Sequence, residues 1–115
     1  MKKSPDAVLV QVAKMKLDPW TIPPRQVLAG KPRASGKLLD GDGRCETGVW
    51  ECTPGSFVWN YDTHQSVCVV SGKAEVVVGR KVLKLVPGSA VFLRAGTQAR
   101  WTVTKTLRKL YTLYY

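Results

Sequence analysis

Short apolar runs separated by turn residues occupy the chain from Gly48 onward. Their length and spacing are typical of β-strands, and eight such runs in under seventy residues are typical of a sandwich or a small barrel. The pattern therefore predicts an all-β domain. The runs are GVWEC, SFVWNY, SVCVVS, AEVVV, KVLKLV, AVFL, ARWTVT and TLRKLYTLYY.

Two of the intervening turns have a specific chemistry. VGRK places Gly79 first of two central residues, as a type II′ hairpin turn requires. VPGS places Pro87 and Gly88 at the two centres of a type II turn. We expect the strands that flank each turn to be adjacent and antiparallel.

The segment before these runs has a different pattern. Between Asp18 and Gly43 prolines and glycines are frequent, and no helical period is sustained. We expect residues 1–44 to form a Pro/Gly-rich N-terminal arm that lies extended over another surface, and residues 45–115 to form the barrel. Because an extended segment can complete and protect a neighbouring sheet edge, we also expect a homodimer.

Size and composition limit the class of protein. A chain of 115 residues with 44% apolar residues is enough for one core. It has no run of 18 apolar residues, and its first residues do not read as an export signal. The three cysteines are odd in number and lack C-x-x-C spacing, which argues against a disulfide framework or a structural zinc site. We expect a cytoplasmic protein with no membrane partner.

The charge of the chain raises the possibility of nucleic-acid binding, because the formal net charge is +10. However, residues 1–44 and residues 45–115 each carry nine Lys or Arg and four acidic residues, so the excess is spread evenly. No RNA-binding aromatic motif, helix-turn-helix spacing or block of like charges occurs. We expect a solvated basic surface and no specific nucleic-acid partner.

An aromatic wall is the first candidate functional feature. In SFVWNY the strand pleat places Phe57, Trp59 and Tyr61 on one face and Val58 and Asn60 on the other. Three aromatic side chains on one face either fill a packed core or line an open pocket, and periodicity alone leaves both possibilities open.

The order of these motifs resembles the cupin superfamily, and within it the small cupin domain typified by ureidoglycine aminohydrolase and the ethanolamine-utilisation cupins. The resemblance covers about residues 45–114 and lies in GVWECTPGSFVWNYD, VSGKAEV, PGSAVFLRAGTQARWTV and LRKLYTL. It implies a double-stranded β-helix, or jelly-roll barrel, whose interior holds a small ligand and often a metal, and which forms dimers.

The resemblance also implies where metal ligands would lie. The general cupin pattern has two histidines and a glutamate in its first motif and a histidine in its second. Here Gln65 stands at the glutamate position, Ala99 at the second-motif histidine, and Trp59 and Tyr61 near the first-motif histidines. None of these is a preferred ligand of manganese, iron, nickel or zinc. We expect no metal and no other cofactor, and we do not expect metal-dependent catalysis.

Two further residues were considered as ligands. His64 is the single histidine, and alternation points it away from Gln65, so we interpret it as an exposed turn residue. Cys68 also faces away from the pocket and is interpreted as a small buried hydrophobic residue.

A set of polar and aromatic side chains remains for the pocket. Lys109 and Tyr111 alternate together in LRKLYTL, and in the family this word lies beside the pocket; alternatively, Lys109 extends to solvent. Of Arg100 and Trp101 only one can face inward. A site with these groups and no carboxylate suits an anionic or carbonyl-bearing small molecule. The expected ligand-binding residues are Trp59, Tyr61, Gln65, Arg94, Trp101, Lys109 and Tyr111.

Three functions remain open at this point. The first is a cupin barrel with a degenerate metal site that binds a small polar or anionic molecule without a metal. The second is a ureidoglycine-aminohydrolase-like enzyme that acts on a C–N bond, although Gln65 removes the expected base. The third is a structural partner whose TLRKLYTLYY edge and Pro-rich arm pair with another chain.

Overall fold

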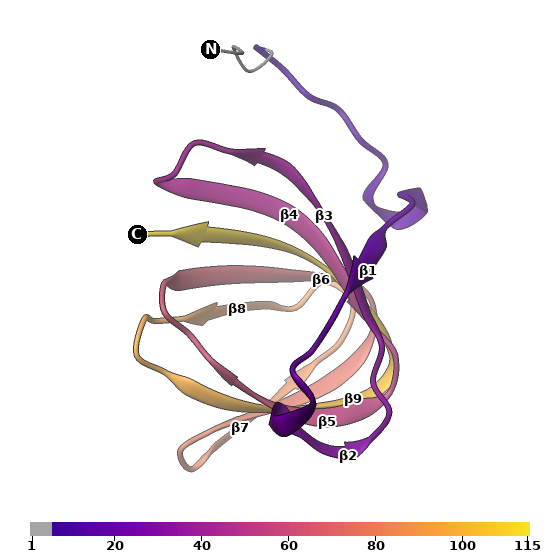
Figure 1. Cartoon of the computed structure of the whole chain (residues 1–115), viewed down its shortest axis with the longest axis vertical. Coiled ribbons are helices and arrows are strands. Elements are labelled where there is room, and N and C mark those ends of the chain that lie inside the picture. Colours follow the sequence, from indigo (N-terminus) through magenta and orange to yellow (C-terminus); the bar gives the residue numbers. More distant parts are fainter. Residues whose placement is uncertain (1–5) are drawn as a thin grey trace.

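The computed structural model describes residues 6–115, which form one strongly curled antiparallel sheet (Figure 1). Among these residues, no helix is long and apolar enough to cross a membrane. Two short 3₁₀ helices, Val12–Lys14 and Pro24–Gln26, accompany the strands. The strands are β1 (Asp18–Trp20), β2 (Val27–Gly30), β3 (Ala34–Gly41), β4 (Cys45–Cys52), β5 (Gly55–Asn60), β6 (His64–Val78), β7 (Lys81–Leu85), β8 (Ala90–Leu93) and β9 (Gln98–Tyr114).

The long strands β6 and β9 lie side by side and belong to both halves of the curled sheet. The C-terminal part of β9 pairs with β4, and its N-terminal part pairs with β5. On the other side, β6 pairs with β9 along nearly its whole length. One half therefore runs β1-β3-β4-β9-β6-β8 and the other β2-β5-β9-β6-β7, and Figure 1 shows the two halves curling toward each other. The prediction of an all-β jelly-roll barrel is confirmed.

β6 and β9 cross from one half of the sheet to the other near Gly72. The pairing of β6 with β9 is irregular from Val69 to Ala74, where the chains bend. Gly72 has φ +86° and lies against the backbone of Thr106 and Leu107. The close approach of the two backbones at this position leaves no room for a side chain.

The predicted turns are present, but one expectation about the strands around them is wrong. Gly79 has φ +59° and Arg80 does not have a positive φ, as a type II′ turn requires, and β6 pairs with β7 across it. Gly88 has φ +89°, and the Ser89 amide donates to the Val86 carbonyl at 2.9 Å, as in a type II turn. However, β7 and β8 do not pair with each other. Both pair with β6, one after the other.

The C-terminal strand is also placed differently from one of the interpretations of the sequence. TLRKLYTLYY was considered as an exposed edge, but this part of β9 has β4 on one side and β6 on the other. Its backbone groups are therefore already paired within the chain. This part of β9 therefore cannot pair as an edge strand with a partner chain.

The segment that precedes Cys45 contributes strands to the sheet of its own chain. β3 pairs with β4, β1 pairs with β3, and β2 pairs with β5. These strands widen both halves of the sheet, because each is added at an outer edge. Three strands between residues 18 and 41 thus continue the sheet of this chain.

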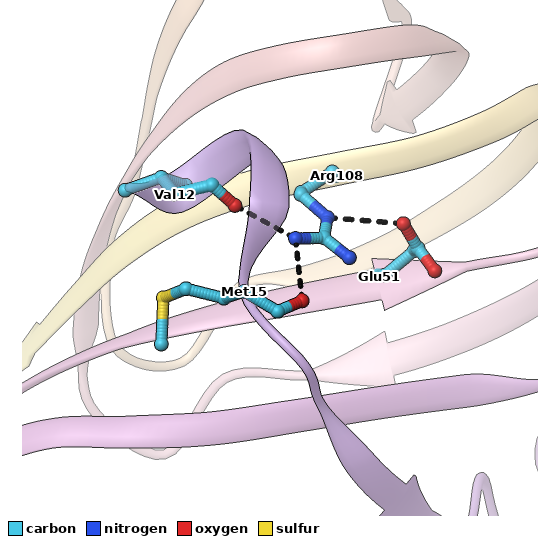
Figure 2. Close-up of polar contacts among 4 residues, drawn as sticks. All are labelled: Val12, Met15, Glu51 and Arg108. Atoms are coloured by element: carbon cyan, nitrogen blue, oxygen red, sulfur yellow. Dashed lines mark hydrogen bonds and ion pairs between the residues drawn. The ribbon is translucent and has the colours of Figure 1, made fainter. Parts of the chain in front are cut away.

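Residues 12–15 of the arm are held against the outer face of the sheet by Arg108 (Figure 2). Its Nη1 donates to the carbonyl oxygens of Val12 and Met15 at 2.7 and 3.0 Å, and its Nε donates to Glu51 Oε1 at 3.0 Å. Because neighbouring residues of a strand face opposite ways, Lys109 points to the inside of the barrel.

Candidate ligand-binding cavity

A cavity of about 330 Å³ lies between the two halves of the sheet. Most of its wall is aromatic, and the exposed residues Asp62 and Tyr115 belong to it, so that it reaches the surface. It is within the size range of small-molecule sites in proteins. Its lining residues are Trp20, Trp50, Phe57, Trp59, Asn60, Tyr61, Asp62, Thr63, Gln65, Lys109, Tyr111, Leu113 and Tyr115.

Lys109 is the central polar group of this cavity. Its side chain is held between two indoles: Nζ lies 4.5 Å from the ring centroid of Trp50 and 4.6 Å from that of Trp101. Nζ is also 3.5 Å from Gln65 Oε1, the outer limit for a hydrogen bond. The register explains the arrangement, because Lys109 is directly opposite Trp50 on the neighbouring strand.

The amine of Lys109 has no carboxylate partner. Only 7% of the residue is exposed, and the single ion pair within residues 6–115 joins Arg108 to Glu51. Burial lowers the pKa of Lys109 from 10.5 to about 7, and an interaction with Cys52 opposes the shift slightly. The indole faces, which attract cations, also oppose it. A buried amine without a counter-ion is a costly arrangement that a bound anion or a reaction at nitrogen would relieve.

Tyr61 and Trp101 are joined at the back of the cavity. The indole Nε1 of Trp101 donates to the hydroxyl of Tyr61 at 2.9 Å, and both side chains are buried. Burial raises the pKa of Tyr61, so its phenol is neutral at physiological pH. Trp101 also stacks on Phe57: the two rings are nearly parallel, and their centroids are 6.3 Å apart. These contacts fix the positions of three aromatic side chains behind and beside the cavity.

The structure brings together most of the residues expected from the sequence. Trp59, Tyr61, Gln65, Lys109 and Tyr111 line the cavity. Trp101 lies directly behind it, in contact with Lys109 and Tyr61. The alternative that Lys109 extends to solvent is wrong, because the residue is buried.

Arg94 is the expected site residue that the structure places elsewhere. It is exposed and does not line the cavity, and its guanidinium lies 5.3 Å from the ring centroid of Phe92. Phe92 is itself 48% exposed on the outside of β8. Arg94 follows the last residue of β8, where strand alternation no longer fixes the direction of a side chain.

The other lining residues are not among those expected from the sequence, and three of them show why. Trp50 alternates with Cys52 in GVWEC and faces inward, a signal that the sequence did contain. Trp20 belongs to the arm and reaches the cavity only because β1 pairs with β3, which brings its ring against Gly36. Asp62 is in the loop between β5 and β6, where no periodicity applies.

The interpretations of His64 and Cys68 need correction. His64 is the first residue of β6 and is half-buried, and its Nδ1 accepts a hydrogen bond from the Ala95 amide at 3.1 Å. It faces away from Gln65, as expected, but it is not a turn residue. Cys68 also faces away from the cavity, but it is exposed and not buried.

The residues at the cupin metal positions do not fit a divalent cation. The Tyr61 hydroxyl accepts the Trp101 hydrogen bond, Gln65 Oε1 faces the amine of Lys109, and Ala99 is a fully buried methyl group. Within residues 6–115, His, Cys, Asp and Glu side chains do not gather in any group of three or more that could hold a metal ion. This donor set supplies neither charge nor imidazole nitrogen.

Comparisons with known proteins agree with the fold. The Clostridium difficile EutQ protein has a TM-score of 0.66 and 19% identity over 72% of this chain and 63% of its own. The cupin domain of Schizosaccharomyces pombe Cnp3 has a TM-score of 0.72 and 16% identity over 93% of this chain and 68% of its own. A Pseudomonas syringae protein of unknown function has a TM-score of 0.79 and 24% identity over 87% of this chain and 45% of its own.

These identities show a shared fold and nothing finer. The chain spans about 63% of the length of the Clostridium EutQ protein and less than half of the Pseudomonas protein. A search of curated protein sequences finds no match. The sequence profile described as "EutQ-like cupin domain" matches residues 39–111, well over half of the chain. The ureidoglycine type is not singled out, and the chain belongs to the family of EutQ-like cupin domains.

Proposed function

We propose that this cupin domain binds a small molecule that carries an anionic or carbonyl group on an apolar body, and that it does so without a metal. The observation that carries the proposal is the amine of Lys109, which lines an aromatic cavity and has no carboxylate partner in the part of the chain that the structure describes. A cavity of about 150 Å³ admits benzene. A cavity of about 330 Å³ therefore has room for a substituted ring.

The walls and the polar groups divide the recognition between them. Trp50, Trp59 and Phe57 offer ring faces and edges to an apolar body. Lys109 offers positive charge or a hydrogen-bond donor, and the Gln65 amide both donates and accepts. Asp62 lines the cavity at its exposed side and disfavours an anionic group there, so that the anionic end of a ligand is directed inward.

We expect benzoate, a planar carboxylate, to quench tryptophan fluorescence on binding, with Lys109→Met weakening its affinity at least tenfold. A charge-assisted hydrogen bond contributes about 1.5 to 3 kcal/mol, and tenfold corresponds to about 1.4 kcal/mol. Lys105→Met is the matched control, because Lys105 is exposed on the same strand. Calorimetry on the three proteins measures the affinities. Equal affinities for parent and Lys109→Met, or no binding of benzoate or other small carboxylates and carbonyl compounds, would contradict the proposal.

We expect the protein as purified to be free of transition metal. Gln65→Glu together with Ala99→His should create weak binding of nickel, zinc or manganese, because these changes restore a carboxylate and an imidazole. Ala99 is fully buried, so the double variant should also lose stability by about 1 to 3 kcal/mol. Calorimetric titration tests the binding, and elemental analysis tests the parent. Near-stoichiometric metal in the parent after dialysis against a mild chelator would refute the expectation.

We also propose that the domain forms a homodimer. Leu28, Val82 and Phe92 are apolar residues about half exposed on strands that pair on one side only. Open edges of this kind favour association with a second copy. Light scattering at micromolar concentration should give twice the 12.7 kDa mass of the chain. A mass equal to that of one chain would contradict the dimer.

A further inference from the structure

We propose that Lys109 forms a reversible imine with an aldehyde or ketone that enters the cavity. The inference rests on the proposed function, because it requires that the cavity admits a small molecule. It goes further by naming the reacting atom, Nζ of Lys109, and the class of ligand. The geometry that supports it is a lysine amine that lines a cavity, is shielded by two indoles and has no carboxylate of residues 6–115 within 4 Å.

The first requirement for such a reaction is an unprotonated amine. An exposed lysine has a pKa of about 10.4, so that only a very small fraction of its amine is unprotonated, and therefore nucleophilic, at neutral pH. Burial lowers the pKa of Lys109 to about 7. Lysines desolvated in apolar pockets are the ones that act as Schiff-base nucleophiles.

The second requirement is that no other cavity group competes. Cys52 is fully buried and does not line the cavity, and burial raises the pKa of its thiol to about 11. Burial also raises the pKa of the Tyr61 and Tyr111 phenols, which keeps both neutral. Lys109 is therefore the only strong nucleophile among the described residues that line this cavity.

The reaction is balanced without any further reactant. The lone pair of Nζ adds to the carbonyl carbon, the carbonyl oxygen gains a proton, and the nitrogen loses one. The resulting carbinolamine takes up a proton on its hydroxyl and releases water as the C=N bond forms. Because the cavity reaches the surface, these protons are exchanged with solvent water. Hydrolysis by the reverse route regenerates the free lysine.

The surroundings of Nζ also suit the product. A protonated imine carries one positive charge at the position of the former ammonium group. The faces of Trp50 and Trp101 lie 4.5 and 4.6 Å from that position and stabilise a cation there. Gln65 Oε1, 3.5 Å from Nζ in the free protein, is an acceptor for the remaining N–H. The same groups that hold the free amine therefore hold the iminium.

The test is reductive trapping of full-length protein with benzaldehyde and sodium cyanoborohydride at pH 7. We expect one benzyl adduct per chain, mapped by mass spectrometry to Lys109, formed at least tenfold faster than at the exposed Lys105. Benzoate in excess should slow the reaction at Lys109 and leave Lys105 unaffected. Lys109→Arg retains a cation but has no primary amine, and should lose the fast adduct. Because the benzoate competition uses the unmodified protein, a variant that fails to fold does not affect it.

The outcomes separate the two proposals. If benzaldehyde and benzoate both quench tryptophan fluorescence but Lys109 gains no adduct faster than Lys105, the imine is wrong and the binding function is retained. If neither compound changes the fluorescence and no fast adduct forms, the binding function is refuted and the imine with it. A fast adduct at Lys109 that benzoate suppresses supports both.

Discussion

Gly72→Ala is expected to lower the free energy of unfolding by at least about 3 kcal/mol, which is a large fraction of the stability of a small domain. Gly72 has φ +86°, a conformation that costs a residue with a Cβ about 1 to 3 kcal/mol. In addition, a Cβ there would overlap the backbone carbonyl of Thr106 and approach the Cα of Leu107. Neither backbone atom can move without disturbing β9, the central strand of both halves.

Gly79→Ala is the matched control for this prediction. Gly79 has φ +59°, but nothing lies within 4 Å of the position that its Cβ would take. Gly79→Ala should therefore lose only the conformational part, about 1 to 3 kcal/mol, and less than Gly72→Ala. Urea unfolding of the parent and both variants measures the difference. If both variants lose the same free energy, the close contact at Gly72 does not contribute and the argument fails.

The second large effect is expected at Lys109. Its pKa is about 7 in the folded protein and about 10.4 in an unfolded chain. Between these values the unfolded chain holds a proton that the folded protein has released, so stability rises with pH. Below about pH 7 both states are protonated and this contribution is constant. From pH 7 to pH 9 we expect an increase of about 2 kcal/mol.

Other titratable groups inside the barrel limit the pH range in which the contribution of Lys109 to stability can be measured. Burial raises the pKa of Cys52 to about 11, so above its ordinary value of 9.0 the folded protein holds a proton that the unfolded chain has lost, and stability falls. The raised pKa values of Tyr61 and Tyr111 likewise lower the stability above pH 10. The pKa of Tyr111 is raised by burial and, in addition, by the negative charge of Glu46. Asp62 at the exposed side is an acidic group of the same cavity. The rise should therefore be sought between pH 7 and 9.

Lys109→Met isolates this contribution. Replacing buried ionised groups by well-packed apolar side chains of similar volume is often neutral or stabilising by up to about 4 kcal/mol, because the cost of desolvating the charge is removed. We expect the variant to be more stable than the parent at pH 7 and to lack the rise toward pH 9, whereas Lys105→Met should retain it. Denaturant unfolding at both pH values gives the slopes. A parent that is equally stable at pH 7 and pH 9 would show that the amine is not perturbed by burial.

A lysine that lowers stability in this way needs a reason to be present. Active and binding sites commonly retain groups that are unfavourable for the fold. The predicted gain on Lys109→Met and the predicted loss of benzoate binding are opposite effects of one substitution. Finding both would assign the residue to binding and not to the fold.

The sequence predicted the local features of this protein well. Apolar runs and turn glycines depend on neighbours in the chain, so the strands and both turn types were predicted from them. Alternation also put Lys109 and Tyr111 on one face, because both lie within one regular strand, and the cupin resemblance implied that this face lies beside the pocket.

The features that could not be predicted from the sequence depend on pairing between strands that are far apart in the chain. The end-to-end placement of β7 and β8 along β6 and the central position of β9 follow from contacts between residues far apart in the chain. The same is true of Trp20, which reaches the cavity through the pairing of β1 with β3. Arg94 was misplaced because it lies just beyond a strand, where the period of two has ended.

The adjacent positions of Arg108 and Lys109 make the barrel sensitive to insertions. Arg108 fastens Val12 and Met15 outside, and Lys109 occupies the cavity inside. A slip of β9 by one residue would exchange the two faces. A guanidinium, which is not deprotonated in proteins, would then replace the amine inside the barrel, and the arm would lose its fastening. The register of β9 thus determines both whether the arm is held on the outer face and which basic group the cavity contains.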